Sequence, residues 1–373
     1  MSCDYIALAN AGVQALQPYQ AGKPIEELER ELGLKDVVKL ASNENPLGAS
    51  DLALQACRKA AQGMYLYPDS SGFELKNKLA ARFNVSPQQI TLGNGSNDVL
   101  DLIARVFLSP GTSAVYSQHA FVVYPIAVQA CGARAIVTPA KDWGHDLDVM
   151  AAAIEDDTRV VFIANPNNPT GTWLKKTELE AFLAKVPENV VVVLDEAYTE
   201  YVDEPEYPNG LDYLAGYPNV IVTRTFSKAF GLAGLRVGYA VSSAQICDLL
   251  NRVRAPFNVS TQALAAAVAV LDDTDYLQKS CEVNAAGLKQ LGEGFDRLGL
   301  EWIPSVGNFI SFRTAKGGAP VDAAKVYQGL LHSGVIVRPV GVYGMPNFLR
   351  VSVGLESENA RFLEALPNVL EAL

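Results

Sequence analysis

The sequence has few of the residues that build disulfide frameworks and metal sites. Its five cysteines are odd in number and scattered, without a Cys-x-x-Cys pair, which fits a reducing compartment and neither a disulfide framework nor a zinc site. Its three histidines, His119, His145 and His332, stand at no metal-ligand spacing from one another. We therefore do not expect a histidine-based metal site.

Basic tracts and long apolar runs are also absent. The 373 residues carry a net charge of −11, which argues against a nucleic-acid binder because such proteins neutralise phosphates with Lys and Arg. The longest apolar stretch, residues 263–271, is far shorter than the roughly 20 residues that span a bilayer. No Lys or Arg precedes Lys23, so the charged start of a secretory signal is missing. We expect a cytoplasmic protein that binds neither nucleic acid nor membranes.

The composition is that of a large globular protein, with 49% hydrophobic and 19% charged residues. Its length exceeds what one hydrophobic core usually supports, so two domains are expected. Short apolar runs rich in β-branched residues alternate with helix-length segments such as 175–186. Their continuous hydrophobicity predicts buried strands in a mainly parallel α/β sheet flanked by helices. These runs are residues 114–116, 135–137, 160–164, 190–194 and 220–223.

The two ends of the chain lack this regular alternation. A charged helix is predicted at 24–32, and the region after residue 270 mixes helices and strands. We predict a large domain over 45–270 and a smaller α+β domain built from 1–44 and 271–373. The elements expected in the C-terminal part are a helix ending at 298, strands at 308–313, 335–337 and 349–353, and a helix at 321–332.

Reactive side chains follow several of the predicted strands, at the edge where ligands bind in open parallel sheets. Asp195 and Lys228 follow the runs at 190–194 and 220–223, and Asn-Pro-Asn-Asn-Pro-Thr-Gly (165–171) follows 160–164. Gly-Asn-Gly-Ser-Asn (93–97) follows an apolar run and opens a helix. Taken singly, each has an ordinary explanation as a turn, a helix cap or a solvated charge. Their order and joint position favour a functional site.

Together these motifs resemble the fold-type-I aminotransferases that depend on pyridoxal phosphate. Ser-Lys-Ala-Phe-Gly-Leu-Ala-Gly-Leu-Arg-Val-Gly (227–238) is similar to the lysine motif of that family. Asn-Pro-Thr-Gly (168–171) and Asp195-x-x-Tyr198 precede it in the expected order, and Leu-Arg-Val-Ser (349–352) resembles the segment of the substrate-carboxylate arginine. The resemblance covers nearly the whole chain. It implies that residues 45–270 form the cofactor-binding domain of a fold-type-I enzyme.

The resemblance also implies roles for individual residues. Lys228 would bind pyridoxal 5'-phosphate as a Schiff base and act as the catalytic base. Asp195 would pair with the protonated pyridine nitrogen, and Tyr198 and Asn168 would hydrogen-bond the ring 3'-oxygen. The phosphate would lie at a helix N-terminus. Its predicted ligands are Gly95, Ser96, Asn97, Ser227 and Arg236.

Two aromatic residues complete the predicted cofactor site. Phe121 aligns with the aromatic residue that stacks on the pyridine ring, although Gln118-His119-Ala120 stands where the family often has Pro-Thr. This departure leaves the role of His119 open. Tyr67 matches a tyrosine that reaches the cofactor phosphate of a neighbouring subunit. The resemblance therefore implies a homodimer with a shared active site.

A narrower resemblance concerns the substrate. Residues 18–27, 40–48 and 334–339 are similar to segments of histidinol-phosphate aminotransferases. This implies exchange of an amino group between L-histidinol phosphate and 2-oxoglutarate, giving imidazole-acetol phosphate and glutamate in histidine biosynthesis. Arg350 and Arg338 are assigned to the substrate anions because guanidinium groups bind carboxylate and phosphate bidentately, with Tyr19 and Asn168 as supporting donors. A surface ion pair is the alternative for Arg338.

Three other functions are compatible with parts of this pattern. An aromatic amino-acid aminotransferase of the same subfamily would use the same cofactor residues and differ only in the distal pocket. A phosphothreonine decarboxylase would need no keto-acid acceptor. A transcription regulator on this scaffold would carry a basic DNA-binding domain ahead of it, whereas the aminotransferase-like segment begins by residue 18 in an acidic chain. No motif identifies the groups that recognise the imidazole.

Overall fold

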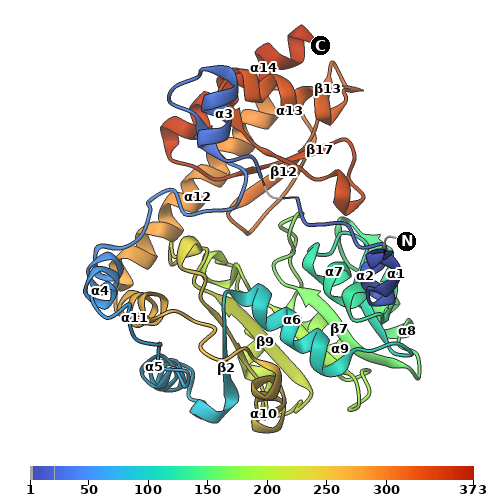
Figure 1. The fold of residues 1–373 in the computed structure, drawn as a ribbon. Coiled ribbons are helices and arrows are strands. Elements are labelled where there is room, and N and C mark those ends of the chain that lie inside the picture. The colour runs from blue at the N-terminus through green and yellow to red at the C-terminus, as the bar shows by residue number, and fades with distance from the viewer. Residues whose placement is uncertain (1–2, 21) are drawn as a thin grey trace.

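A seven-stranded sheet organises the middle of the chain in the computed structural model, which describes residues 3–20 and 22–373 (Figure 1). Its order is β2-β10-β9-β8-β7-β3-β4. All neighbours pair in parallel except β10, which is antiparallel to both β2 and β9. The predicted mainly parallel α/β sheet is thus confirmed. The strands are Ile90–Gly93 (β2), Ser113–Ser117 (β3), Arg134–Thr138 (β4), Thr158–Ala164 (β7), Val191–Asp195 (β8), Val220–Thr225 (β9) and Gly238–Val241 (β10).

Burial of the strands follows their place in this sheet. β3, β8 and β9 are buried along their whole length, and β7 is buried except at Arg159, as the continuous apolar runs predicted. The prediction of a buried strand at 135–137 is wrong for β4, where Val137 is 52% exposed. β4 lies at the end of the strand order, so only β3 covers one of its edges.

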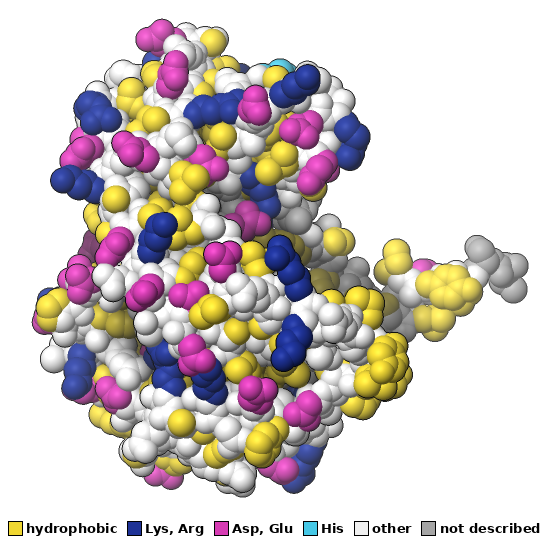
Figure 2. Space-filling model, turned by 90° about the vertical axis from the view of Figure 1, so that its left-hand side faces the viewer, with side chains coloured by type: hydrophobic (Ala, Val, Ile, Leu, Met, Phe, Trp, Pro, Cys, Tyr) yellow, Lys and Arg dark blue, Asp and Glu magenta, His cyan; other side chains and the backbone are white. Residues whose placement is uncertain are grey.

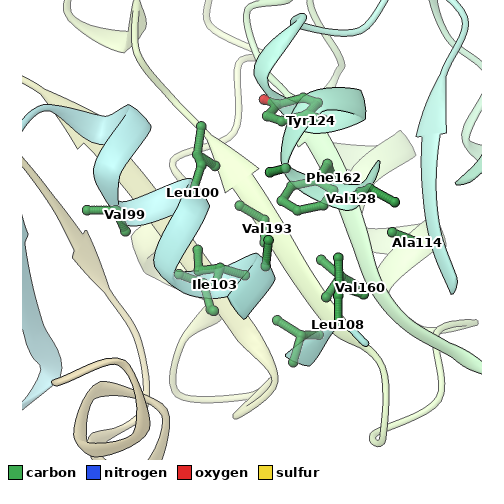
Figure 3. Close-up of a cluster of buried hydrophobic side chains, with 14 of the residues drawn as sticks. Val99, Leu100, Ile103, Leu108, Ala114, Tyr124, Val128, Val160, Phe162 and Val193 are labelled. Atoms are coloured by element: carbon green, nitrogen blue, oxygen red, sulfur yellow. The ribbon is translucent and has the colours of Figure 1, made fainter. Parts of the chain in front are cut away.

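Helices cover both faces of the sheet, and side chains alternate between them along each strand. Phe162 of β7 packs in one cluster with residues of α6 (Ser96–Phe107), α7 (Val123–Ala130) and α10 (Ala244–Val253). Its neighbours Val161 and Ile163 pack in another cluster with α8 (Leu147–Ala152) and α9 (Lys176–Leu183). Figure 3 shows Leu100 and Ile103 of α6 turned toward Val160 and Val193 of the sheet. This packing fixes the start of α6 at the carboxyl edge of the strands.

Three more helices lie beyond β2, on the lower left in Figure 1. They are α4 (Asp51–Ala61), α5 (Phe73–Phe83) and α11 (Thr261–Val270), and α11 contacts both others. Short hairpins and 3-10 turns join the larger elements. These are Ala140–Lys141 (β5) with Gly144–His145 (β6), Ala315–Lys316 (β13) with Ala319–Pro320 (β14), Pro87–Gln89 (η1), Thr199–Tyr201 (η2), Gly210–Tyr213 (η3), Ala233–Leu235 (η4) and Gly341–Tyr343 (η5).

The upper lobe in Figure 1 contains an antiparallel sheet of order β11-β12-β17-β16. A parallel pair of β1 (Val38–Lys39) with β15 (Val335–Ile336) joins the N-terminal segment to this C-terminal lobe. That pairing supports the proposed division into residues 45–270 and a second domain from both ends. The other elements are Trp302–Ile303 (β11), Phe309–Arg313 (β12), Arg338–Pro339 (β16), Phe348–Ser352 (β17), Ile25–Leu32 (α3), Thr274–Arg297 (α12), Ala323–His332 (α13) and Glu356–Ala372 (α14).

The first residues of the chain lie apart from this lobe. α2 (Ala11–Gln14), which follows α1 (Tyr5–Leu8), stands beside α7 of the large sheet (Figure 1). A Cβ at Gly12 would collide with the Gln129 carbonyl, so only glycine permits this close approach. The proposed small domain therefore excludes these two helices, although the sequence assigned all of residues 1–44 to it.

Membrane-spanning helices and metal-binding clusters are both absent from residues 3–20 and 22–373. No helix in these ranges is both long and apolar enough to cross a bilayer. Nor does this part of the chain contain a group of three or more His, Cys, Asp or Glu side chains placed to hold a metal ion.

Candidate active site

Polar side chains from both lobes line one cavity beyond the carboxyl ends of β7, β8 and β9. Most of the residues that the sequence singled out meet there, although they come from positions 19 to 350. Gly95 and Tyr67 are the exceptions. The predicted residues on the cavity wall are Tyr19, Ser96, Asn97, Phe121, Asn168, Asp195, Tyr198, Ser227, Lys228, Arg236, Arg338 and Arg350.

Asp195 ends β8 as a buried carboxylate with two fixed hydrogen-bond donors. Its Oδ2 accepts from the Tyr124 hydroxyl at 2.8 Å and its Oδ1 from Thr223 Oγ1 at 3.0 Å. Burial raises the pKa of Asp195 to about 6, while these two hydrogen bonds and the charge of Lys228 act to lower it. The carboxyl group is therefore mostly ionised at neutral pH in a site where an unpaired charge is costly.

Lys228 follows β9 and directs its amine into the same cavity. Its Nζ donates to the backbone carbonyls of Ser42 and Asn43, both at 3.3 Å, and lies 5.6 Å from the ring centre of Tyr198. Burial, followed by the nearby Arg350 guanidinium, lowers the pKa of Lys228 to about 7. A large fraction of this amine is consequently neutral near pH 7, which a nucleophile or proton acceptor requires.

Tyr198 is held by groups from the other lobe. Its hydroxyl accepts a hydrogen bond from Asn43 Nδ2 at 2.9 Å, and its ring packs edge-on against Phe309. The Asn43 carbonyl accepts from Asn308 Nδ2, and the Asn43 amide oxygen accepts from Ser352. Burial raises the pKa of Tyr198 to about 12, so its hydroxyl keeps its proton.

One end of the cavity is built to hold an anion. Ser96 begins the twelve-residue helix α6, whose first amides point out of the helix, and Asn97 follows it. Arg236 donates through Nη1 to Ser227 Oγ at 3.2 Å. Gly95 has φ +81°, and a Cβ there would strike the Arg236 guanidinium. Gly95 thus lies beneath the arginine and off the wall of the cavity, because it provides room for that side chain.

Two arginines of the cavity wall stand side by side, because Arg338 of β16 pairs in register with Arg350 of β17. Arg350 is 5% exposed and donates to Asn168 Oδ1 at 2.6 Å and to the Ala41 carbonyl at 2.8 Å. Its buried Nε has no hydrogen-bond partner in the described chain. Arg338 donates to the Gln20 carbonyl at 2.6 Å and lies over the Tyr19 ring, and within residues 3–20 and 22–373 it forms no ion pair of the kind considered for it.

Two predicted aromatic residues occupy different settings. Phe121 lines the cavity and packs edge-on against Tyr124, at 5.9 Å between ring centres. Tyr67 is 82% exposed and stacks on Phe257 outside the cavity. A stacking role for Phe121 and a partner-subunit role for Tyr67 remain predictions.

Sequence reasoning missed several groups that shape the site. Tyr124 lies one helical turn after Phe121, and this i, i+3 spacing after a strand was a usable signal. Asn43 and Ser42 contact Lys228 although they lie 185 and 186 residues from it in the sequence. Helix and strand periodicity predicts no contact at such a separation. Tyr343 lines the same cavity as the two predicted arginines and belongs to no recognised motif.

Comparisons with known proteins agree on one family. Residues 35–366 match the family model described as aminotransferase class I and II. The chain is 61% identical over 369 residues to histidinol-phosphate aminotransferase 2 of Pseudomonas aeruginosa, covering 98% of this chain and 99% of that one. It is 58% identical over 374 residues to histidinol-phosphate aminotransferase 1 of Thiobacillus denitrificans, covering 99% and 96%. Its fold resembles the histidinol-phosphate aminotransferase of Sinorhizobium meliloti solved with pyridoxal-5'-phosphate, with a TM-score of 0.88, 32% identity and 97% of each chain covered.

Proposed function

The chain belongs to the aminotransferase class I and II family, and from this premise we propose that it exchanges an amino group between L-histidinol phosphate and 2-oxoglutarate. The products are imidazole-acetol phosphate and L-glutamate, in histidine biosynthesis. The names of the relatives at 61% and 58% identity support this substrate pair. The Sinorhizobium meliloti structure, which contains pyridoxal-5'-phosphate, supports that cofactor for this chain.

The residues of the cavity fit pyridoxal 5'-phosphate. Lys228 supplies an amine whose pKa of about 7 suits covalent attachment, and Asp195 supplies a buried carboxylate for the pyridine nitrogen. Ser96, Ser227 and Arg236 offer donors and positive charge for the phosphate at the start of α6. The bound cofactor supplies an electron sink for the negative charge that develops at the substrate α-carbon.

The proton that leaves the substrate α-carbon is carried by Nζ of Lys228. Because the pKa of this amine is about 7, it can accept the proton and return it at neutral pH. The carbonyls of Ser42 and Asn43 accept from Nζ and limit its motion within the cavity. Asn43 donates to the Tyr198 hydroxyl, and Arg350 donates to the Asn168 side-chain oxygen. These bonds fix both side chains and leave the Tyr198 hydroxyl proton and the Asn168 amide nitrogen as donors beside it.

Arg350 and Arg338 bind the anionic groups of both substrates, and their register on β16 and β17 is the observation that carries this substrate class. One pocket must accept the phosphate of histidinol phosphate and the carboxylates of 2-oxoglutarate in turn. Planar guanidinium groups bind either anion bidentately. The free Nε of Arg350 leaves a buried donor for such a ligand, since an unpaired buried donor otherwise costs about 1–3 kcal/mol.

A homodimer is part of this proposal. Met64, Tyr65, Leu66 and Tyr67 form a continuous apolar segment that is 62–82% exposed, and exposed apolar patches mark interfaces. In Figure 2 the N-terminal arm projects from the body of the molecule and carries further hydrophobic side chains. We assign Tyr67 to the cofactor phosphate of the partner. Sedimentation should give twice the chain mass, and Tyr67→Phe should weaken cofactor binding without dissociating the dimer.

We also place the enzyme in the cytoplasm, where its free cysteines stay reduced.

The test of the function is a substrate panel on the purified holoenzyme. Single-turnover amine transfer from histidinol phosphate, phenylalanine and tyrosine is measured separately, followed by turnover with and without 2-oxoglutarate. We expect the fastest transfer from histidinol phosphate and a strict requirement for the keto acid. A preference for phenylalanine would assign the enzyme to aromatic substrates, and carbon dioxide release without a keto acid would make it a decarboxylase.

A further inference from the structure

A histidine without a role in the predicted site forms a direct contact between the two lobes. His119 precedes the Phe121 loop of the large sheet and is 5% exposed. Its Nδ1 lies 2.7 Å from the backbone carbonyl of Tyr343, in the 3-10 turn η5 of the other lobe. Because a carbonyl can only accept, Nδ1 carries the proton and donates it. This hydrogen bond spans 224 residues of sequence.

His119 is itself fixed on the large-lobe side. Its own carbonyl accepts from Asn167 Nδ2 at 3.0 Å, and Asn167 also donates to Thr170 in the loop after β7. The imidazole packs against the ring of Trp143 at 5.3 Å between centres. The donor nitrogen is therefore held in place before the other lobe contacts it.

The turn that receives this hydrogen bond is also held by its own backbone hydrogen bonds and by apolar packing. Within it, the Tyr343 amide bonds to the Val340 carbonyl and the Gly344 amide to the Gly341 carbonyl. Gly344 has φ +73°, and the nearest groups to a Cβ there are Gln118 and His119. Tyr343, Val340 and Phe348 form a small apolar cluster against which Trp143 of the large lobe packs. His119 adds a directional bond to this contact, which apolar packing alone does not provide.

Tyr343 belongs to the cavity wall at its substrate end. It is 5% exposed, lines the cavity with Tyr19, Arg338 and Arg350, and its hydroxyl has no protein partner in the described chain. Its aromatic ring is thus available to contact a substrate ring, and its hydroxyl can donate or accept at the same place. The sequence offered no candidate for recognition of the imidazole.

We propose that His119 is a positioning residue that holds η5 against the large lobe, so that Tyr343 forms the wall contacting the imidazole ring of the substrate. The positioning half depends only on the contacts of His119. The recognition half rests on the proposed function, because it takes histidinol phosphate as the ring-bearing substrate. 2-Oxoglutarate has no ring, so loss of this wall affects it less.

The positioning half is tested by hydrogen exchange of the intact holoenzyme, read in peptides covering 340–345. His119→Ala should speed exchange there about fivefold, the effect of one net hydrogen bond. His119→Asn should exchange like wild type, because its Nδ2 replaces Nδ1 as donor. His145→Ala is the matched control, since this second buried histidine bonds to Ala164 within its own lobe. Equal exchange in wild type and His119→Ala, or no rescue by His119→Asn, overturns the positioning role.

The recognition half is tested by steady-state kinetics with each substrate varied. Tyr343→Ala and His119→Ala should raise KM for histidinol phosphate about fivefold to tenfold, more than KM for 2-oxoglutarate, with kcat less affected. His119→Asn should restore KM. Equal changes in both KM values overturn recognition by Tyr343. If wild-type enzyme does not use histidinol phosphate, the proposed function and this half fail together, and hydrogen exchange still decides the positioning role.

Discussion

Replacing Tyr124 by Phe tests how the buried carboxylate of Asp195 is kept ionised. The Tyr124 hydroxyl donates to Asp195 Oδ2 at 2.8 Å and lowers its pKa, against the larger effect of burial that raises it to about 6. A hydrogen bond to a charged group contributes about 1.5–3 kcal/mol, and one pKa unit corresponds to about 1.4 kcal/mol. Loss of this bond should therefore raise the pKa of Asp195 by roughly one to two units.

The expected consequence is a pH-dependent loss of cofactor affinity. The carboxylate form of Asp195 favours a protonated pyridine nitrogen, so cofactor binding weakens as pH falls through the pKa of the carboxyl group. Because the pKa of Asp195 is higher in the variant, the cofactor affinity of the variant should begin to fall at a higher pH than that of wild type. The ratio of its dissociation constant to that of wild type should be near one above about pH 9 and roughly fivefold to fiftyfold at pH 6.

The assay titrates both apoproteins with pyridoxal 5'-phosphate across this pH range. Taking the ratio at each pH removes the titration of Lys228 and of the cofactor, which both proteins share. Tyr116→Phe is the matched control, because Tyr116 is a buried tyrosine of β3 that does not contact Asp195. A ratio that is flat with pH would refute the reasoning, since it would show that Tyr124 does not set the charge of Asp195.

Three further predictions concern other groups. Lys228→Met should raise the free energy of unfolding of the apoprotein at pH 7 by on the order of 4 kcal/mol, in urea titrations. The folded pKa of Lys228 is lowered to about 7 from 10.5, so the gain should fade as pH rises toward 10.5, and a pH-independent gain would contradict it. Arg350→Ala should raise KM for both substrates and lower kcat at least tenfold, because orientation is lost with binding; unchanged kcat would argue against that role. Arg224→Ala should destabilise by about 3–5 kcal/mol by leaving buried Glu196 unpaired, whereas Arg252→Ala, in an exposed pair, should change stability by less than about 1 kcal/mol; similar losses would refute the burial argument.

Local patterns in the sequence were sufficient for the large sheet. Continuous apolar runs identified β3, β7, β8 and β9 because a strand buried on both faces tolerates few polar side chains. The same reasoning failed for β4, since an edge strand can have the composition of a central one. It also missed β10, which begins at the last residue of the lysine motif and pairs antiparallel with β2 and β9.

The sequence alone determined which chemistry the chain carries. Lys228, Asp195 and Arg236 lie in short motifs placed directly after strands, and the chain direction of parallel strands brings such motifs to one edge. Resemblance to a family then gave each motif its expected role. Both inferences use either residues that are close together in the sequence or the order of the motifs along the chain.

Only the tertiary structure decided how these groups are tuned and oriented. The pKa of Asp195 depends on Tyr124 and Thr223, which lie 71 and 28 residues away. Tyr343 lines the cavity, and its backbone carbonyl accepts a hydrogen bond from His119, 224 residues from it. Burial and hydrogen-bond geometry arise from the packing of distant segments, and no local period in the sequence records which segments will meet.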